Sequence, residues 1–275
     1  MTFSLDGVGA VDAWINPNLR PPTSLNRDVA YLFPGLLERY ERGTTLSQLL
    51  DEMDEAGVAK AVLCAGYTED DEDVEWVRMA IGKHPERFAG SYAVNPHEGM
   101  KTVRLVERLV RDEGFRLIRI IALFTQIPYD DARCYPVYAK CAELGVPVGL
   151  NVGIPGPLVP GKHQHPLALD DVCAFFPELT VVMQHGGEPW VDLCVKLMLK
   201  WPNLHYMTSA FAPKHLPEAI VRYVNTRGAD KVMFASDYPL LTLERCMREA
   251  AELPFKDQER FEKFVARNAE ALFFS

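Results

Sequence analysis

Residues 179–200 read LTVVMQHGGEPWVDLCVKLMLK, and this stretch contains the pattern on which the fold assignment rests. Its first six residues form a short, mostly apolar run, as expected of a strand buried on both faces of a parallel sheet. A histidine and two glycines follow at 185–187, and residues 189–200 then show the apolar spacing of an amphipathic helix. The stretch therefore predicts a strand, a polar turn and a helix, which together are the repeating unit of a parallel α/β fold.

The same unit recurs along the whole chain. The predicted strands cover residues 7–13, 58–64, 88–94, 115–121, 146–151, 179–184, 204–209 and 231–236. The predicted helices cover residues 45–57, 73–84, 100–113, 135–145, 170–176, 189–200 and 217–227, and one or two terminal helices cover 255–274. Eight strands with right-handed helical crossovers predict an α/β fold of the (β/α)8 TIM-barrel type, with an open sheet as the alternative.

Length and composition agree with one such barrel. The chain has 275 residues, and a TIM barrel commonly has roughly 250, so residues 1–275 are predicted to form a single domain. Hydrophobic residues make up 48% and charged residues 24%, as in a folded protein. The net charge of −9 disfavours nucleic acids and anionic membranes as partners, so a small-molecule substrate is expected.

The cysteines and the N-terminus suggest a reducing compartment. The six cysteines are scattered, with no C-x-x-C pair, and are expected mainly to fill the core. The opening MTFSLDGVGAVDAW has neither a basic leader nor an apolar stretch of signal length, and no apolar run reaches the roughly 20 residues that span a bilayer. A cytoplasmic, soluble protein is the expectation.

Polar and aromatic residues stand where several predicted strands end. The carboxyl ends of TIM-barrel strands carry the catalytic residues, and residues 16–28 and 154–166 are predicted to be loops over this end. The candidates chosen on this basis are Trp14, Asn16, Arg119, Asn151, His185, Glu188 and Asp237. Each also has a structural alternative: Asp237 could cap a helix, Trp14 could belong to the core, and the asparagines could form turns.

Four segments resemble the amidohydrolase superfamily. They are HGGEPW at 185–190, KWPNLHYMTSAFAP at 200–213, KVMFASDYP at 231–239 and ARNAEALF at 266–273. Their order and spacing are similar to the decarboxylase-related branch, which includes aminocarboxymuconate-semialdehyde decarboxylase and resorcylate decarboxylases. The resemblance implies a (β/α)8 barrel, and because dimers are common in this branch a homodimer is one expected assembly.

The same resemblance implies a metal site that this chain has largely lost. Relatives usually begin with D-x-H-x-H on strand 1, where this chain has Asp12, Trp14 and Asn16, and they end strand 5 with a histidine where it has Asn151. The strand-6 histidine, the acid/base of that branch, corresponds to His185, and the strand-8 aspartate to Asp237. Zinc prefers imidazole, thiolate and carboxylate ligands, so no bound metal or other cofactor is expected, and a divalent metal such as zinc is the disfavoured alternative.

The candidates suggest a chemistry that needs no metal. His185 and Asp237 are predicted to be a catalytic acid/base pair. Asn16 and Asn151 are predicted to donate hydrogen bonds to a substrate carbonyl or oxyanion, and Trp14 to offer a flat face to a ring. Arg119 is predicted to hold a substrate carboxylate through two hydrogen bonds, and Glu188 to be a further substrate-binding residue.

Three functions follow as hypotheses. The first is a metal-independent hydrolase acting on a small lactone-like, possibly carboxylated substrate, which the resemblance permits because the neighbouring pyronedicarboxylate lactonases hydrolyse without a metal. The second is a non-oxidative decarboxylase of an aromatic or muconate-type acid, a chemistry in which a metal normally polarises the substrate. The third is a catalytically silent barrel that binds a ligand.

Overall fold

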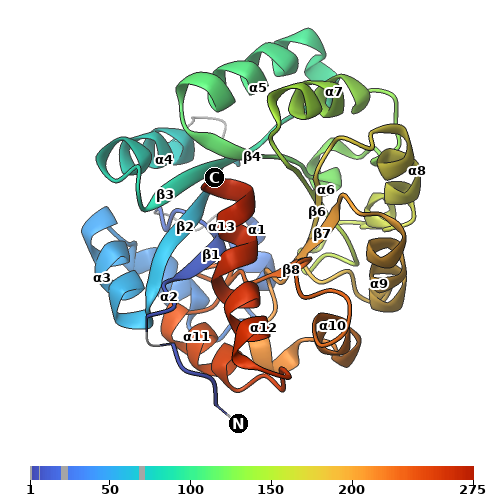
Figure 1. The fold of residues 1–275 in the computed structure, drawn as a ribbon. Helices are drawn as coiled ribbons and strands as arrows, with labels where there is room; N and C mark the ends of the chain where they lie inside the picture. Colours follow the sequence, from blue (N-terminus) through green and yellow to red (C-terminus); the bar gives the residue numbers. More distant parts are fainter. Residues whose placement is uncertain (1, 6, 20–23, 68–71) are drawn as a thin grey trace.

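Eight parallel strands pair in chain order and form the inner wall of the molecule (Figure 1). The structure is a computed structural model, and it describes residues 2–5, 7–19, 24–67 and 72–275. The strands are β1 Ala10–Ile15, β2 Val58–Ala65, β3 Phe88–Ala93, β4 Phe115–Ile120, β5 Val148–Asn151, β6 Val181–Gln184, β7 Leu204–Met207 and β8 Val232–Met233. The strand order confirms the predicted TIM-barrel fold.

Backbone hydrogen bonds between the last strand region and the first close the barrel. The amide of Ala13 donates to the carbonyl of Phe234 (3.2 Å), and the amide of Asp237 donates to the carbonyl of Trp14 (3.1 Å). An isolated parallel bridge joins Ile15 to Tyr238. The segment after β8 therefore lies beside β1, although it is too irregular to count as a regular strand.

The strand boundaries differ from the predicted ones most at β8. Residues 231–236 were expected to form a strand, but only Val232–Met233 do so. The next three amides bond outside the ladder: Phe234 donates to the carbonyl of Phe264, Ala235 to Oγ1 of Thr208, and Ser236 to Oδ1 of Asp12. These partners are distant in sequence, so the local apolar pattern could not reveal them.

Helices surround the strands. Their bounds are α1 Ser24–Val29, α2 Leu36–Arg42, α3 Leu46–Ala56, α4 Glu72–Lys83, α5 Met100–Asp112, α6 Ala122–Thr125, α7 Tyr135–Leu144, α8 Ala168–Phe175, α9 Val191–Lys200, α10 Glu218–Val224, α11 Leu243–Ala251, α12 Gln258–Glu262 and α13 Asn268–Phe273. Short 3-10 turns lie at Pro96–Glu98, Lys162–Gln164 and Pro213–His215.

The predicted helices are present, but four helices were not foreseen. These are α1, α2, α6 and α11. Helix α1 begins inside the predicted loop 16–28, of which residues 20–23 lie outside the described residues. The helix after β6 begins at Val191 instead of residue 189, because the turn that carries Glu188 extends to Trp190. Helices α1 and α6, of six and four residues, are too short to show an apolar repeat, whereas the nine-residue α11 is long enough and was missed.

The C-terminal segment covers the barrel end opposite the strand carboxyl ends. It consists of α12, a π-helical stretch at Lys263–Arg267 and α13, and it crosses in front of the strands in Figure 1. Asn268 donates to the carbonyls of Ala229 and Val232, at the start of β8. One barrel end is therefore closed, and the other is left for a site.

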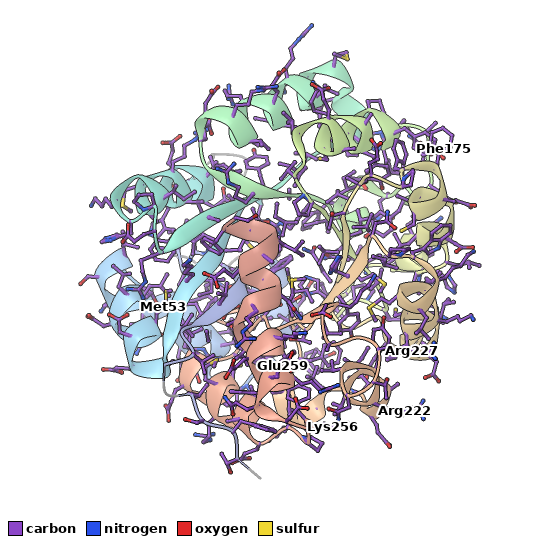
Figure 2. The ribbon with its side chains drawn as sticks, viewed as in Figure 1. Met53, Phe175, Arg222, Arg227, Lys256 and Glu259 are labelled. Carbon is purple, nitrogen blue, oxygen red and sulfur yellow. The ribbon has the colours of Figure 1, made fainter. Side chains whose placement is uncertain are left out.

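Side chains fill the space between the strands and the helices (Figure 2). Met53 of α3 is fully buried against the strands, whereas Phe175 on α8 is 67% exposed at the periphery. All six cysteines are buried and free, in agreement with their predicted role in the core. No helix in the described part of the chain is long and apolar enough to span a membrane.

Candidate functional site

A cavity of about 980 Å³ opens at the carboxyl ends of the strands. Its floor includes Trp14 near the end of β1, Asn16 directly after it, Asn151 at the end of β5, and His185 and Asp237 after β6 and β8. Its outer wall comes from α1, α6 and the loop after β5. This size is at the upper end of the range of about 300–1,000 Å³ typical of small-molecule sites.

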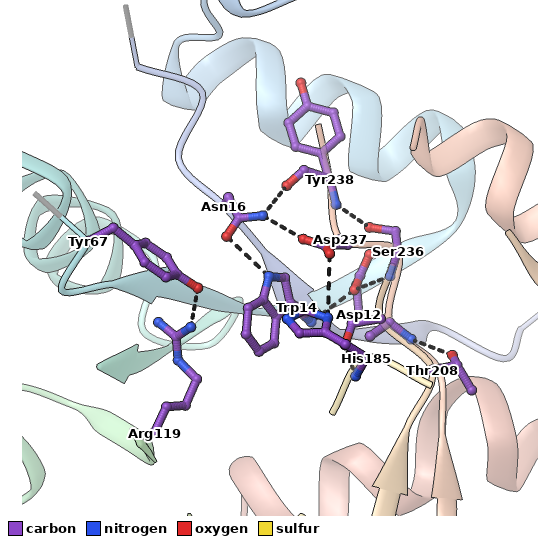
Figure 3. A network of polar contacts seen from close by, with 12 residues as sticks. Asp12, Trp14, Asn16, Tyr67, Arg119, His185, Thr208, Ser236, Asp237 and Tyr238 are labelled. Carbon is purple, nitrogen blue, oxygen red and sulfur yellow. Dashed lines mark hydrogen bonds and ion pairs between the residues drawn. The ribbon is translucent and has the colours of Figure 1, made fainter. Parts of the chain in front are cut away.

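His185 and Asp237 face each other across the cavity floor. Nδ1 of His185 lies 3.6 Å from Oδ2 of Asp237, and Figure 3 shows the two side chains converging from different strands. Both residues have a left-handed backbone, with φ of 62° and 59°. That conformation is uncommon for residues other than glycine, and such strained backbone often occurs at functional sites.

Asn16 holds the Asp237 carboxylate in place. Its Nδ2 donates to Oδ1 of Asp237 at 2.7 Å and to the carbonyl of Tyr238 at 3.1 Å, while its Oδ1 accepts from Nε1 of Trp14 at 3.1 Å (Figure 3). These three partners fix the orientation of the amide and use both of its N–H groups. Asn16 is therefore a positioning residue in this structure, with no N–H left for the substrate carbonyl that it was predicted to bind.

Burial sets the protonation of the pair. It raises the pKa of Asp237 to about 7, with the neighbouring Asp12 adding to the rise and the hydrogen bond from Asn16 opposing it. Burial lowers the pKa of His185 to about 3, and the positive charge of Arg119 lowers it further. Near neutral pH the imidazole is therefore uncharged, and the pair carries its exchangeable proton on Asp237.

Asp12 lies beneath this pair as a second buried carboxyl group. Its Oδ1 accepts from the amides of Trp14 and Ser236, both at 3.0 Å, and its Oδ2 has no partner among the described residues. Burial raises the pKa of Asp12 to about 6. The aspartate thus ties the end of β1 to the segment after β8 and does not line the cavity.

Arg119 lies between two aromatic rings under the cavity floor. Its guanidinium carbon is 4.5 Å from the ring centroid of Trp14 and 4.6 Å from that of Tyr67. The guanidinium donates to the hydroxyl of Tyr67 and, at 2.8 Å, to the carbonyl of Ala65 (Figure 3). Arg119 is fully buried and does not line the cavity, so it does not present a fork to a substrate carboxylate as predicted.

Trp14 is also more a part of the floor than an open platform. Its side chain is 2% exposed, and its ring meets the imidazole of His185 edge-on with centroids 4.5 Å apart. The indole therefore separates the Arg119 cation from the acid/base pair and fixes the position of both.

Asn151 and Glu188 both line the cavity, as expected of substrate-binding residues. Oδ1 of Asn151 is buried without a partner among the described residues, and both polar atoms of the neighbouring Gln184 are in the same condition. Glu188 is exposed on the turn after β6. Asn151 therefore keeps its hydrogen-bonding capacity for a ligand.

Tyr67 is a cavity residue that sequence reasoning did not select. Its hydroxyl accepts a hydrogen bond from Arg119, and its own O–H hydrogen has no acceptor in the described ranges. Burial raises the pKa of Tyr67 well above its ordinary value, so the group remains a neutral donor. Its place two residues after β2 was the available signal, because Tyr67 lies at the same barrel end as the other candidates.

Comparison with known proteins agrees with the fold. The model of the amidohydrolase family matches residues 11–274. The chain therefore belongs to the amidohydrolase family, and the resemblance found in its sequence is confirmed. A search of curated proteins returns no match.

Solved structures share the fold over nearly the full chain. An uncharacterised TIM-barrel protein from Bordetella bronchiseptica is 25% identical, with a TM-score of 0.78, over 96% of this chain and 97% of that one. The 5-carboxyvanillate decarboxylase of Novosphingobium aromaticivorans, solved with manganese and a nitrobenzoic acid, is 18% identical (TM-score 0.69; 100% and 98% covered). A probable 2-pyrone-4,6-dicarboxylic acid hydrolase of Acinetobacter baumannii, with citric acid bound, is 16% identical (TM-score 0.69; 97% and 100% covered).

The residues of this site do not fit the metal that the family implies. An indole offers no lone pair to a metal, and at Asn16 the amide oxygen accepts from Trp14 while the amide N–H groups point at Asp237 and Tyr238. Within the described ranges, no three histidine, cysteine, aspartate or glutamate side chains lie close enough together to hold an ion. Asp237 and His185 alone are fewer than the four ligands of a typical zinc site.

Proposed function

We propose that this amidohydrolase-fold enzyme is a metal-independent hydrolase of a cyclic ester or a related acyl compound, with Asp237 and His185 as its acid/base pair. The observation that carries the proposal is a carboxyl group of pKa about 7, held 3.6 Å from an uncharged imidazole at the floor of a large cavity. A general base works best when its pKa is near the working pH, and Asp237 meets this condition where His185, with a pKa of about 3, does not.

Hydrolysis would proceed by two proton transfers. Ionised Asp237 accepts a proton from a water molecule through Oδ2, because Oδ1 is occupied by Asn16. The resulting hydroxide attacks the ester carbonyl and forms a new C–O bond. When the ring C–O bond breaks, the departing alkoxide takes the proton from Asp237 with His185 as the relay, so the product is a hydroxy acid and the pair is restored.

The developing oxyanion requires donors that the resting protein does not already use. Asn151 lines the cavity, its Oδ1 has no partner, and its Nδ2 donates no hydrogen bond in the described part of the chain, so the amide N–H is free to donate to an oxyanion. The hydroxyl of Tyr67 is polarised by Arg119 and retains its own hydrogen. We assign these two groups as the oxyanion donors, a task that is typically worth about a hundredfold or more in kcat for each donor.

Decarboxylation of an aromatic or muconate-type acid is the second candidate. It is favoured by the similarity to the 5-carboxyvanillate decarboxylase fold. Against it, the residues at the metal positions do not fit an ion, and the guanidinium of Arg119, which acts on both members of the pair, lies under the floor. A barrel that only binds a ligand is the third possibility.

The test uses the purified full-length protein. Its metal content is measured first, and turnover of a lactone and ester panel is then compared with that of aromatic carboxylic acids, with and without a chelator. We expect lactone or ester hydrolysis that the chelator does not affect and that Asp237→Asn and His185→Ala both abolish. Carbon dioxide release with about one equivalent of tightly bound manganese or zinc would establish the decarboxylase instead, and ligand binding without turnover would establish the silent barrel.

A further inference from the structure

The outer wall of the cavity is apolar, unlike its floor. Leu32 follows α1, Phe124 belongs to α6 and Ile154 belongs to the loop after β5, and all three line the cavity. They are also 50%, 46% and 62% exposed, although large apolar side chains are normally covered. Three separate elements thus direct apolar side chains at one space, which is a mark of a binding surface.

The loop after β5 and the region of α1, which contribute to this wall, lie next to each other. A Cβ atom on Gly156 would lie 3.3 Å from Cγ1 of Val29 and 3.6 Å from Cδ1 of Leu32. The loop after β5 therefore passes close to Val29 and Leu32, and together these segments form one side of the cavity. The apolar wall is a built part of the site and not a set of scattered surface residues.

The ionisable side chains among the described lining residues of the cavity are mostly acidic. Among its described lining residues, Glu72, Asp73, Glu188 and Asp237 are acidic, and Arg245 is the one arginine or lysine. Arg245 is already paired, because its Nε donates to Oε1 of Glu249 at 2.8 Å. Since Arg119 is also buried beneath the floor, a carboxylated ligand would meet repulsion with little compensation.

We infer that the substrate is an uncharged ester or lactone with an apolar alkyl or aryl extension. The acyl head lies at the floor beside Asp237 and His185, and the extension covers Leu32, Phe124 and Ile154. A lactone ring alone would occupy only a small part of the 980 Å³ cavity, whereas an extended molecule would fill it. This inference rests on the proposed hydrolase for the reaction, but the binding of the extension can be measured separately.

The experiment uses two matched series. One is a set of δ-lactones whose alkyl chain is lengthened from methyl to octyl, together with counterparts that end in a carboxylate. The other is the set of cyclohexanones with the same chains at the matching ring carbon, which bind but cannot be hydrolysed. We expect kcat/KM and the cyclohexanone affinity both to rise about three- to fourfold per added methylene, the equivalent of about 0.8 kcal/mol, until the wall is covered.

A positive charge introduced on the wall provides the variant. Ile154→Lys should abolish the chain-length dependence and favour the carboxylated compounds. Leu158→Lys is the matched control, because Leu158 is in the same loop, is 77% exposed and does not line the cavity, so it should leave both series unchanged.

The outcomes separate the two proposals. Chain-dependent binding of the cyclohexanones without lactone turnover would sustain the substrate class and remove the hydrolase. Turnover or binding that is independent of chain length, a preference for carboxylated compounds in the unmodified protein, or no binding of any member would overturn the inference.

Discussion

The two halves of the cavity floor differ in how their polar groups are paired. In the half between β8 and β1, which we call the paired half, Trp14, Asn16, Asp237 and Tyr238 are linked by hydrogen bonds. In the half formed by β5 and β6, the unpaired half, Asn151 Oδ1 and His185 Nδ1 have no hydrogen-bond partner in the described chain. Leaving a buried polar group unpaired costs about 1–3 kcal/mol, so the unpaired half is suited to gain partners from a ligand.

The two halves of the floor therefore have different roles: the paired half positions Asp237, and the unpaired half is available to bind a ligand. The paired half fixes the proton acceptor in one geometry before any substrate arrives, which is the preorganisation that catalysis by positioned groups requires. The unpaired half keeps its hydrogen-bonding capacity. Substitution of Asn16, which positions the base in the paired half, should therefore affect stability and the pKa of Asp237, whereas loss of Asp237 itself, or of Asn151 in the unpaired half, should affect turnover.

The largest effect is expected for Asp237→Asn. Removing the general base should lower kcat/KM for lactone hydrolysis by at least about a hundredfold. The amide nearly preserves the shape of the side chain and tolerates the left-handed φ of 59°. Steady-state kinetics beside a circular-dichroism melt would check this, and a folded variant that retained more than a tenth of the activity would remove Asp237 from the mechanism.

Asn16→Ala tests the paired half. The change removes three hydrogen bonds and leaves the indole N–H of Trp14 without its acceptor, so we expect a loss of about 2 kcal/mol in the free energy of unfolding. Urea denaturation gives the measurement. Asn151→Ala is the matched control, because its side chain has no hydrogen-bond partner to lose and its stability should be almost unchanged. Equal losses in the two variants would contradict the division into halves.

The pH profile should report the carboxyl group of Asp237. Since the ionised form is the base and its pKa is about 7, kcat/KM should fall about tenfold per pH unit below neutrality and level off above it. The hydrogen bond from Asn16 stabilises the ionised form, so its removal in Asn16→Ala should move this acid limb to higher pH. An acid limb near pH 4, or one that Asn16→Ala does not move, would assign the base to another group.

Asn151→Ala is expected to give the smallest change in activity. The loss of one of the two oxyanion donors should reduce kcat by about a hundredfold with little change in KM, because the interaction strengthens in the transition state. A change confined to KM would place Asn151 in ground-state binding instead.

The sequence could predict those parts of the site that depend on local patterns, but not those that depend on contacts between residues far apart in the chain. The short apolar runs that predicted the strands are local features, and the strand ends placed His185 and Asp237 at the same barrel end. Their separation of 3.6 Å follows from the barrel closing between β8 and β1 through contacts such as Ser236 to Asp12. The sequence contains no local signal for such contacts.

Arg119 is a residue whose role the sequence pattern predicted wrongly. In sequence it alternates with apolar neighbours near the end of a strand, which is compatible with a side chain that reaches toward the substrate. In the structure it is held by Ala65 at the end of β2, by Tyr67 just after that strand, and by the ring of Trp14 in β1. Those partners are more than fifty residues away and decide that the cation lies under the floor.

The contacts of Trp14 also make it an optical sensor of the site. Its indole touches a guanidinium on one side and an imidazole on the other, and its N–H is linked through Asn16 to the carboxyl group that titrates near neutrality. Indole emission responds to nearby charge and to water, so the arrival of a ligand or of a proton will alter it. Replacement of Trp76, Trp190 and Trp201 by phenylalanine would leave Trp14 as the one tryptophan of the four, and its fluorescence would then follow occupancy in real time without a coupled assay.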